Sequence, residues 1–157
     1  MEGENAVQLI AYADRLGGDL RGLQSLLNNE FRDLFDGVHL LPFFDPIDGA
    51  DAGFDPIDHT RVDPRLGDWN DIASLAAEYT LMADLIVNHV SVDSPQFQDV
   101  RRNGNTSPYW DLFLRKSDVF PGDETASAIE AEVKRIYRPR PGLPFTPIAL
   151  DDGASHD

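Results

Sequence analysis

The stretch that decides the fold is residues 37–59, GVHLLPFFDPIDGADAGFDPIDH, in which an apolar run passes directly into an acidic loop. Residues 38–44 are almost entirely apolar, which is typical of a strand buried on both faces in a parallel sheet. The loop that follows carries closely spaced aspartates: Asp45, Asp48, Asp51, Asp55 and Asp58. A cluster of five carboxylates is unfavourable in a packed interior. We therefore expect the loop either to bind a ligand or to be fully hydrated.

Two further apolar runs have the same pattern, residues 7–13 (VQLIAYA) and 81–87 (LMADLIV). Helices are expected between the runs, because Asp19 and Asp68 can cap helices whose apolar residues recur at spacings of three and four. These apolar residues are Leu20, Leu23, Leu27, Phe31 and Leu34 in the first helix, and Ile72, Leu75, Ala76 and Tyr79 in the second. Strands that alternate with helices over short connections predict parallel strands with right-handed crossovers, and hence an α/β fold.

All strands of such a sheet end on the same side. In open doubly wound sheets and in closed barrels, binding residues gather beyond the carboxyl ends of the strands. We therefore expect Asp14, the loop of residues 45–59, Asn88 and His89 to lie on one face of the domain.

The pattern changes after His89. Ser94 and Pro95 can start a short helix that carries Phe97 and Val100, and the next residues show no clear periodicity. Prolines at 139, 141 and 144 predict an extended chain over residues 136–145. The sequence thus divides into residues 1–89, with the α/β pattern, and residues 90–157, without it.

Composition restricts the partners and the chemistry. The 157 residues include 28 acidic and 13 basic side chains, and a net charge of -15 disfavours binding to nucleic acid or to an anionic membrane. The chain has no cysteine, which excludes disulfides, thiolate metal sites and a cysteine nucleophile. It shows no signal-peptide pattern and no apolar run of about 20 residues, so a soluble, cytoplasmic protein is expected. The motifs of serine hydrolases, Rossmann folds and P-loops are absent.

The acidic loop has three interpretations. Its aspartate spacing fits a calcium loop poorly, since prolines separate the carboxylates. Each aspartate could instead cap a turn in a hydrated loop. In the third interpretation, Asp51 accepts hydrogen bonds from vicinal sugar hydroxyls while Phe54 covers the apolar face of the sugar ring. That pair of residue types is common, so the spacing alone does not choose between turn-capping and sugar binding.

A second candidate group is Asp84, Asn88 and His89 in the segment ADLIVNH. Alternation along a strand places Asp84 and Asn88 on one face, and His89 begins the following loop. A buried Asp84 would need a partner, for which we expect an arginine. A structural ion pair with a surface histidine is the alternative, and the pattern taken alone favours it. No second histidine stands at metal-ligand spacing, so no zinc site is expected.

A third candidate group is Tyr137, Arg138 and Arg140 in YRPRPGLPF. Two guanidinium groups on a proline-stiffened segment could grip phosphate or a carboxylate, because the planar fork of arginine matches their oxygens. Pairing with the many aspartates is the alternative, and it is favoured for Arg138.

Six segments together resemble the N-terminal part of the sucrose phosphorylases, which are members of the α-amylase superfamily. The segments are VQLIAYADRLGG, DGVHLLPFF, DGADAGFDPIDHT, DLIVNH, FQDV and YRPRPGLPF, and they extend from residue 7 to residue 145. DLIVNH is similar to a motif of the whole superfamily, whereas DGADAGFDPIDH and YRPRPGLPF are more specific to the phosphorylases.

The resemblance implies a (β/α)8 TIM barrel with a small domain inserted after its third strand. Residues 1–89 would form about three βα units, and residues 90–157 would begin the inserted domain. The implied reaction converts sucrose and inorganic phosphate to α-glucose 1-phosphate and fructose, with retention through a glucosyl-enzyme intermediate and without cofactor or metal. Asp51 and His89 would hold glucosyl hydroxyls beside Phe54, and Arg140 would meet phosphate or the fructosyl group. Asp84, with Asn88, would support the site.

Retaining glycoside chemistry needs two carboxyl groups about 5 Å apart. By resemblance, the nucleophile Asp and the acid/base Glu come from later strands, so we expect this chain to be an inactive fragment with an exposed apolar edge. A glucosylglycerate or sucrose 6′-phosphate phosphorylase, or an α-glucosidase, is the alternative enzyme. A non-catalytic α/β module that binds a sugar or a partner is the alternative from another class. The full-length protein could form a homodimer.

Overall fold

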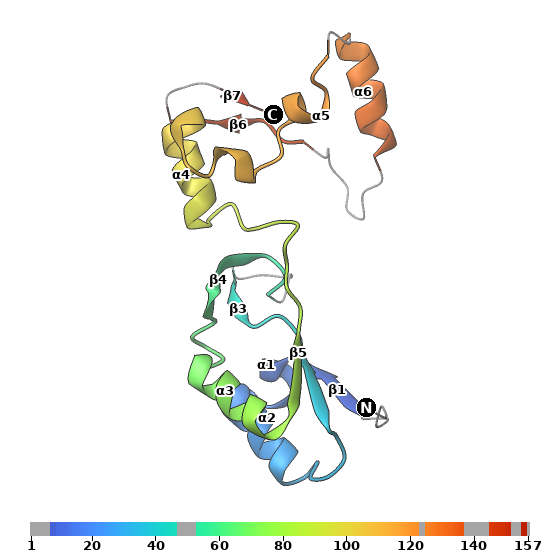
Figure 1. Cartoon of the computed structure of the whole chain (residues 1–157), viewed down its shortest axis with the longest axis vertical. Coiled ribbons are helices and arrows are strands. Elements are labelled where there is room, and N and C mark those ends of the chain that lie inside the picture. Colours follow the sequence, from blue (N-terminus) through green and yellow to red (C-terminus); the bar gives the residue numbers. More distant parts are fainter. Residues whose placement is uncertain (1–6, 47–52, 123–124, 137–144, 152–154, 157) are drawn as a thin grey trace. The chain divides into compact units, whose positions relative to one another are not determined.

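The computed structural model describes residues 7–46, 53–122, 125–136, 145–151 and 155–156. The chain forms two compact units, residues 1–95 (unit 1) and residues 96–157 (unit 2). Unit 1 contains the predicted strands and the helices between them (Figure 1). The division falls after Pro95, a few residues beyond the change of pattern seen in the sequence.

Unit 1 is built on a parallel sheet of three strands in the order β1-β2-β5. The strands are β1 (Gln8–Ala11), β2 (Gly37–Leu40) and β5 (Thr80–Ala83), each shorter than its apolar run in the sequence. Residues paired across the sheet form rows, of which Leu9–Val38–Leu81 is one and Ile10–His39–Met82 is the next. The parallel pairing confirms the predicted α/β class.

The two faces of the sheet differ in burial. The row of Leu9, Val38 and Leu81 packs in or against the core. In the next row Ile10 is 63% exposed and Met82 is 47% exposed. The expectation of strands buried on both faces is therefore wrong at Ile10 and Met82, because the described residues leave this part of the second face open. Beyond β5, Leu85 and Val87 are also exposed, as expected for an open apolar edge.

Helices α1 (Ala13–Leu16), α2 (Leu20–Asn28) and α3 (Trp69–Glu78) complete this part of unit 1. Both predicted caps are present: the Asp19 carboxylate accepts from the Gly22 amide, and the Asp68 carboxylate accepts from the amides of Asn70 and Asp71. The core gathers residues of α2, α3 and β2 with neighbouring aromatic rings; its most buried members are Leu20, Leu23, Leu27, Val38, Leu40 and Leu75.

Helix α2 ends earlier than the apolar spacing predicts. Phe31 and Leu34 lie in the turns that follow Asn28, and Leu34 is 56% exposed. Asp33 adopts a positive φ of 62°, a backbone conformation that no helical residue can have. The chain must turn back after Asn28 to enter β2 at Gly37. The helix therefore ends before Phe31 and Leu34, although their spacing continues the apolar pattern.

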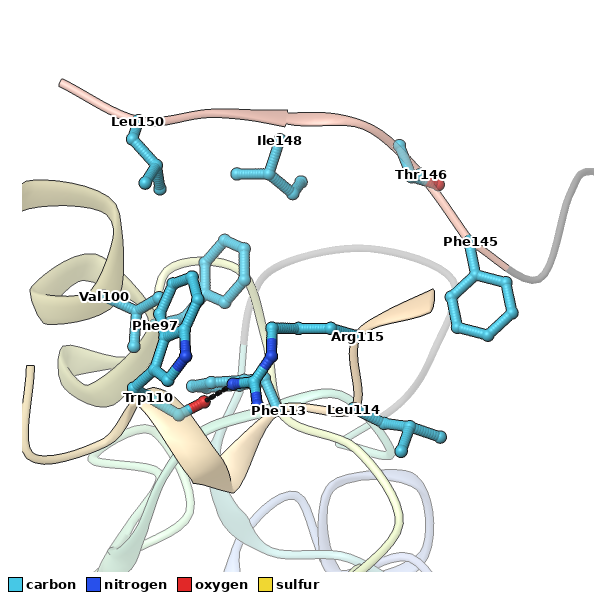
Figure 2. A pocket seen from close by; sticks show the side chains of 10 residues that line it. All are labelled: Phe97, Val100, Trp110, Phe113, Leu114, Arg115, Phe145, Thr146, Ile148 and Leu150. Atoms are coloured by element: carbon cyan, nitrogen blue, oxygen red, sulfur yellow. Dashed lines mark hydrogen bonds between the residues drawn. The ribbon is translucent and has the colours of Figure 1, made fainter. Parts of the chain in front are cut away.

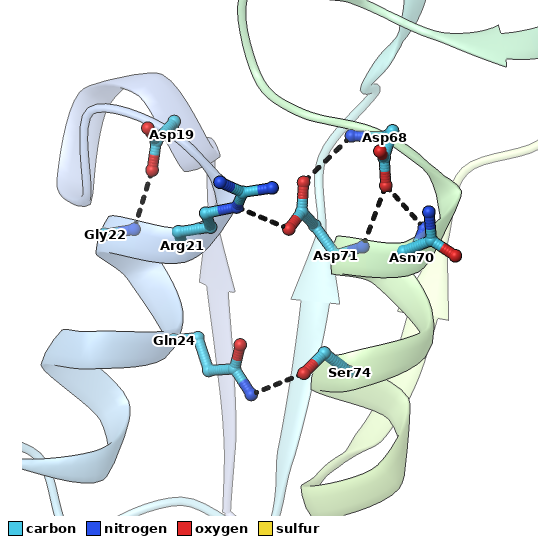
Figure 3. A network of polar contacts seen from close by, with 8 residues as sticks. All are labelled: Asp19, Arg21, Gly22, Gln24, Asp68, Asn70, Asp71 and Ser74. Carbon is cyan, nitrogen blue, oxygen red and sulfur yellow. Dashed lines mark hydrogen bonds and ion pairs between the residues drawn. The ribbon is translucent and has the colours of Figure 1, made fainter.

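Polar contacts join α2 to α3 along their exposed sides (Figure 3). Arg21 Nε donates to the Asp71 carboxylate at 2.8 Å, and Asp71 also accepts from the Asp68 amide at 3.0 Å, which completes a capping box. One turn further along, Gln24 donates to the Ser74 hydroxyl at 3.2 Å. These contacts fix the relative position of the two helices that cover the core.

The acidic stretch after β2 forms a hairpin where the sequence predicts a loop. Strands β3 (Phe44–Pro46) and β4 (Pro56–Val62) pair antiparallel, with irregular register on either side of Asp45. Proline is found in strands only at edges and at irregular positions. The two DPID segments therefore favoured a turn over a strand in the sequence. We call the described residues of this element, 44–46 and 53–62, the hairpin.

Unit 2 begins with the expected helix, α4 (Pro95–Asn103). It continues through short helices η1 (Gly104–Thr106), η2 (Trp110–Leu112) and α5 (Lys116–Val119) to α6 (Ala126–Arg135). The antiparallel strands β6 (Ile148–Ala149) and β7 (Ser155–His156) complete it. Helix α6 was not predicted, since a single residue of it, Val133, is buried and no apolar stripe marks it.

Candidate functional site

The residues that follow β5 run beside the hairpin. We call residues 84–91 the post-β5 segment; it contains three of the predicted site residues. Three hydrogen bonds join it to the hairpin: His59 Nε2 with the Ile86 carbonyl at 2.7 Å, His89 Nε2 with the Phe54 carbonyl at 2.6 Å, and the Ser91 amide to the Pro56 carbonyl at 3.0 Å. The hairpin is thereby held at the carboxyl end of the sheet, where the sequence places the site.

The contact between His89 and Phe54 brings together two of the residues predicted to bind sugar. A carbonyl oxygen only accepts hydrogen bonds, so Nε2 of His89 must carry the hydrogen. In the neutral imidazole Nδ1 is then an acceptor, which can receive a hydrogen bond from a hydroxyl group. Phe54 is 37% exposed as a residue, so solvent or a ligand can reach part of it.

Asp84 does not have the expected arginine partner. Its carboxylate lies 3.2 Å from Nε2 of His39, and its side chain is 35% exposed. Because β5 ends at Ala83, Asp84 begins the post-β5 segment and is not buried inside a strand. The exposed Asn88 lies in the same segment outside any strand, so alternation along β5 does not place it. The expectation of a buried Asp84–Arg pair is wrong among the described residues.

Asp51 and Arg140 fall outside the described residues, as do Asp48, Tyr137 and Arg138. Their predicted roles therefore have no geometry in this structure. Of the six residues singled out in the sequence as substrate-binding or supporting, the structure places four in unit 1: Phe54, Asp84, Asn88 and His89.

Two histidines that the sequence analysis did not single out take part in the site. His39 is paired with Asp84, and His59 joins β4 to the post-β5 segment while its ring packs 5.7 Å from that of Phe44. For His39, a signal was present in the sequence: it is a polar residue in the middle of the apolar run GVHLLPFF. His59 follows the second DPID, where a turn was the simpler interpretation.

Several aspartates of the hairpin serve its backbone. Asp58 accepts from the hydroxyl of Thr60 at 2.7 Å and from its amide at 2.8 Å, and these bonds lower the pKa of the Asp58 carboxyl. Asp45 lies 3.5 Å from Arg61 across the two strands. Asp58 is thus bonded to the residue two positions further along β4, and Asp45 is paired with a cation.

Asp63, just after β4, is 5% exposed and anchors the base of the hairpin. Burial disfavours its charged form, but hydrogen bonds that the guanidinium group and the amide of Arg65 donate to its carboxylate outweigh this and lower its pKa. The Asp63 amide also donates to the Phe43 carbonyl at 2.8 Å. This bond holds the residue before β3 against the residue after β4 and so closes the base of the hairpin.

Unit 2 contains an apolar cavity of about 150 Å³ (Figure 2). Aromatic and aliphatic side chains line it, among them Phe97, Val100, Trp110, Phe113, Ile148 and Leu150. The guanidinium group of Arg115 lies at one side, where it donates to the Trp110 carbonyl at 2.8 Å and pairs with Asp118 at 3.0 Å. Because this cation is already engaged, we assign the cavity to the packing of unit 2.

Within the described residues, no three His, Cys, Asp or Glu side chains come close enough together to hold a metal ion. The helices described also include none whose length and hydropathy would allow it to cross a bilayer.

A parallel strand–helix sheet with polar side chains beyond its carboxyl edge places unit 1 among the α/β proteins, which include open doubly wound sheets and α/β barrels. The sequence profile described as "Alpha amylase, catalytic domain" matches residues 2–134. The chain therefore belongs to the α-amylase family, as its motifs predict.

Individual relatives are more specific. The chain is 56% identical over 144 residues to the sucrose phosphorylase of Bifidobacterium adolescentis, a match that covers 91% of this chain and 28% of that protein. It is 51% identical over 152 residues to the sucrose phosphorylase of Agrobacterium vitis, covering 96% of this chain and 30% of that protein. These matches confirm the predicted resemblance, and the chain spans less than a third of each relative's length.

A solved structure agrees in fold. The sucrose 6F-phosphate phosphorylase from Thermoanaerobacter thermosaccharolyticum superposes with a TM-score of 0.87 at 34% identity, over 99% of this chain and 31% of that one. Unit 1 is thus a partial α/β barrel, as predicted.

Proposed function

We propose that this chain supplies part of the glucosyl-binding site of a retaining phosphorylase that converts sucrose and phosphate to α-glucose 1-phosphate and fructose. In this proposal, unit 1 is the first three βα units of a (β/α)8 barrel. Unit 2 is part of a small inserted domain, with a boundary near residues 89–95. The relatives support the reaction class, because both sucrose phosphorylases match over most of this chain.

The observation that carries the proposal is the contact between His89 and Phe54 at the carboxyl end of the sheet. The bond is accepted by the backbone carbonyl of Phe54, so it fixes the distance between the two residues. The aromatic ring of Phe54 can cover the C–H face of a glucosyl ring, and the acceptor Nδ1 of His89 can receive a hydroxyl hydrogen bond. We assign Asp51 as the carboxylate that accepts from the sugar hydroxyls, and Arg140 as the cation that meets phosphate or the fructosyl group. Asp84 and Asn88 support the post-β5 segment that carries His89.

The chemical step needs residues that we do not assign to this chain. Retention requires a carboxylate nucleophile and a carboxyl acid/base about 5 Å apart. Three described carboxylates of the hairpin and the post-β5 segment already have partners: Asp58 with Thr60, Asp45 with Arg61, and Asp84 with His39. We therefore expect the 157-residue chain alone to release no glucose 1-phosphate.

The test uses the longer protein that contains this chain. Purified enzyme should release glucose 1-phosphate from sucrose and phosphate, and Asp51→Ala should reduce turnover far more than Asp45→Ala, whose carboxylate is paired with Arg61. Equal losses would show that the wrong aspartate has been assigned. Release of glucose without phosphate would favour an α-glucosidase, and activity only with glucosylglycerate or a phosphorylated sucrose would change the assigned acceptor.

A non-catalytic sugar-binding module is the competing function. Calorimetric titration of the isolated chain with sucrose separates the two proposals. We expect weak or no binding, because the glucosyl site is incomplete in the chain alone. Tight binding by the isolated chain, together with inactivity of the longer protein, would favour the module.

A further inference from the structure

His59 occupies a position that the proposed glucosyl site does not explain. It belongs to β4, yet its Nε2 reaches out of the hairpin to the carbonyl of Ile86, 27 residues further along the chain, at 2.7 Å. The carbonyl can only accept, so Nε2 of His59 carries the hydrogen. Ile86 is 8% exposed, so the contact lies largely out of water.

The contact connects the two elements that carry the sugar-binding residues. Phe54 lies on the hairpin, and His89 lies on the post-β5 segment. The two elements are also joined by the bonds from His89 to Phe54 and from Ser91 to Pro56. The His89 bond uses a binding residue itself, and the Ser91 bond is made by the backbone. The His59 contact differs from the other two. It is made by a side chain, and that side chain has no role in the proposed binding of sugar, so it can be replaced without removing a proposed binding residue.

We propose that His59 is a positioning residue that sets the spacing between Phe54 and His89 by holding the hairpin against the post-β5 segment. The proposal rests on the proposed function for its consequence in catalysis. The ring of His59 is itself held at 5.7 Å from Phe44, which is 6% exposed and belongs to the core of unit 1. The donor is thus presented from a rigid base, as a positioning residue requires.

The strand β4 offers a matched control. Trp69 Nε1 donates to the carbonyl of Thr60 at 2.8 Å, so it also makes one N–H···O=C bond to the hairpin from an aromatic ring. That bond ties β4 to helix α3 and makes no contact with the post-β5 segment. Trp69→Phe should therefore cost similar stability to His59→Phe but leave the spacing of Phe54 and His89 unchanged.

The first arm of the test uses amide hydrogen exchange in the 157-residue chain to measure how firmly the post-β5 segment is held against the hairpin. The Ser91 amide, 1% exposed as a residue and bonded to Pro56, reports whether the post-β5 segment stays on the hairpin. His59→Phe should lower the protection of this amide about tenfold, whereas His59→Gln, which keeps a donor, should restore it. Trp69→Phe should leave it unchanged. Equal protection in all variants would overturn the proposal.

The second arm measures kinetics in the longer enzyme. His59→Phe should raise the KM for sucrose about five- to tenfold, roughly what one hydrogen bond is worth, with His59→Gln close to wild type. Trp69→Phe should leave KM unchanged at the same loss of thermal stability. Equal KM changes for His59→Phe and Trp69→Phe would show a merely structural role. A wild-type enzyme without phosphorolysis would overturn the proposed function, while the Ser91 amide would still decide whether His59 holds the two elements together.

Discussion

Replacement of Asp71 by alanine should destabilise unit 1 by an amount that the contacts of its carboxylate determine. Asp71 accepts from Arg21 on α2 and from the Asp68 amide at the start of α3, and its side chain is 12% exposed. The lost bond from the Asp68 amide, which is the reciprocal half of the capping box, is worth about 1 kcal/mol. The ion pair adds roughly 0.5 kcal/mol, because the Arg21 side chain is 77% exposed and water screens it. We therefore expect Asp71→Ala to lower the free energy of unfolding by about 1.5 kcal/mol.

Urea unfolding followed by the fluorescence of Trp69 measures this effect in unit 1. The chain contains two tryptophans, and Trp110 belongs to unit 2, so the Trp110→Phe background leaves a reporter in α3 alone. At a slope of about 1.5 kcal/mol per molar urea, the midpoint should fall by roughly 1 M. Arg21→Ala removes only the ion pair and should shift the midpoint by about a third as much. Equal shifts for the two variants would refute the reasoning that the helix cap dominates.

Two further outcomes follow from the carboxylates and glycines of unit 1. Hydrogen bonds from Arg21 and Thr60 lower the pKa values of Asp71 and Asp58 below their ordinary value of 3.8, so their stabilisation is complete above that value and is lost as the pH falls below it. The urea midpoint should accordingly decrease below about pH 4, and less so in Asp58→Asn; identical pH profiles would contradict this origin. Gly53 and Gly18 have φ of 86° and 85°, but a Cβ on Gly53 would lie 2.6 Å from the Pro42 carbonyl oxygen, whereas one on Gly18 would meet nothing within 4 Å. Both alanine variants should lose about 1 kcal/mol to the left-handed backbone, and Gly53→Ala should lose more, as its urea midpoint will show.

The local features of unit 1 were predictable because their determinants lie within a few residues of one another. Asp19 and Asp68 cap the helices that follow them, and the leucines of α2 point into the core at the spacing that the sequence displays. The parallel order of the strands followed from alternation with helices. The family followed from six short motifs.

The site was predictable only in part. The sequence placed Phe54 and His89 on one face, and the structure brings them into contact. It did not predict the hairpin, because the prolines of DPID favour turns, and it gave Asp84 the wrong partner. His39, the actual partner, lies 45 residues away on β2.

The sequence by itself therefore determined the class of fold, the helix caps and the end of the sheet at which the candidate residues Phe54 and His89 lie. Each of these follows from the periodicity of neighbouring residues and from chain connectivity. Only the tertiary structure decided which side chains meet: His59 with Ile86, His89 with Phe54, and His39 with Asp84 are separated by 27, 35 and 45 residues. Such pairs form only when the hairpin packs at the end of β5. A pattern among neighbouring residues does not predict contacts between residues so far apart in the sequence.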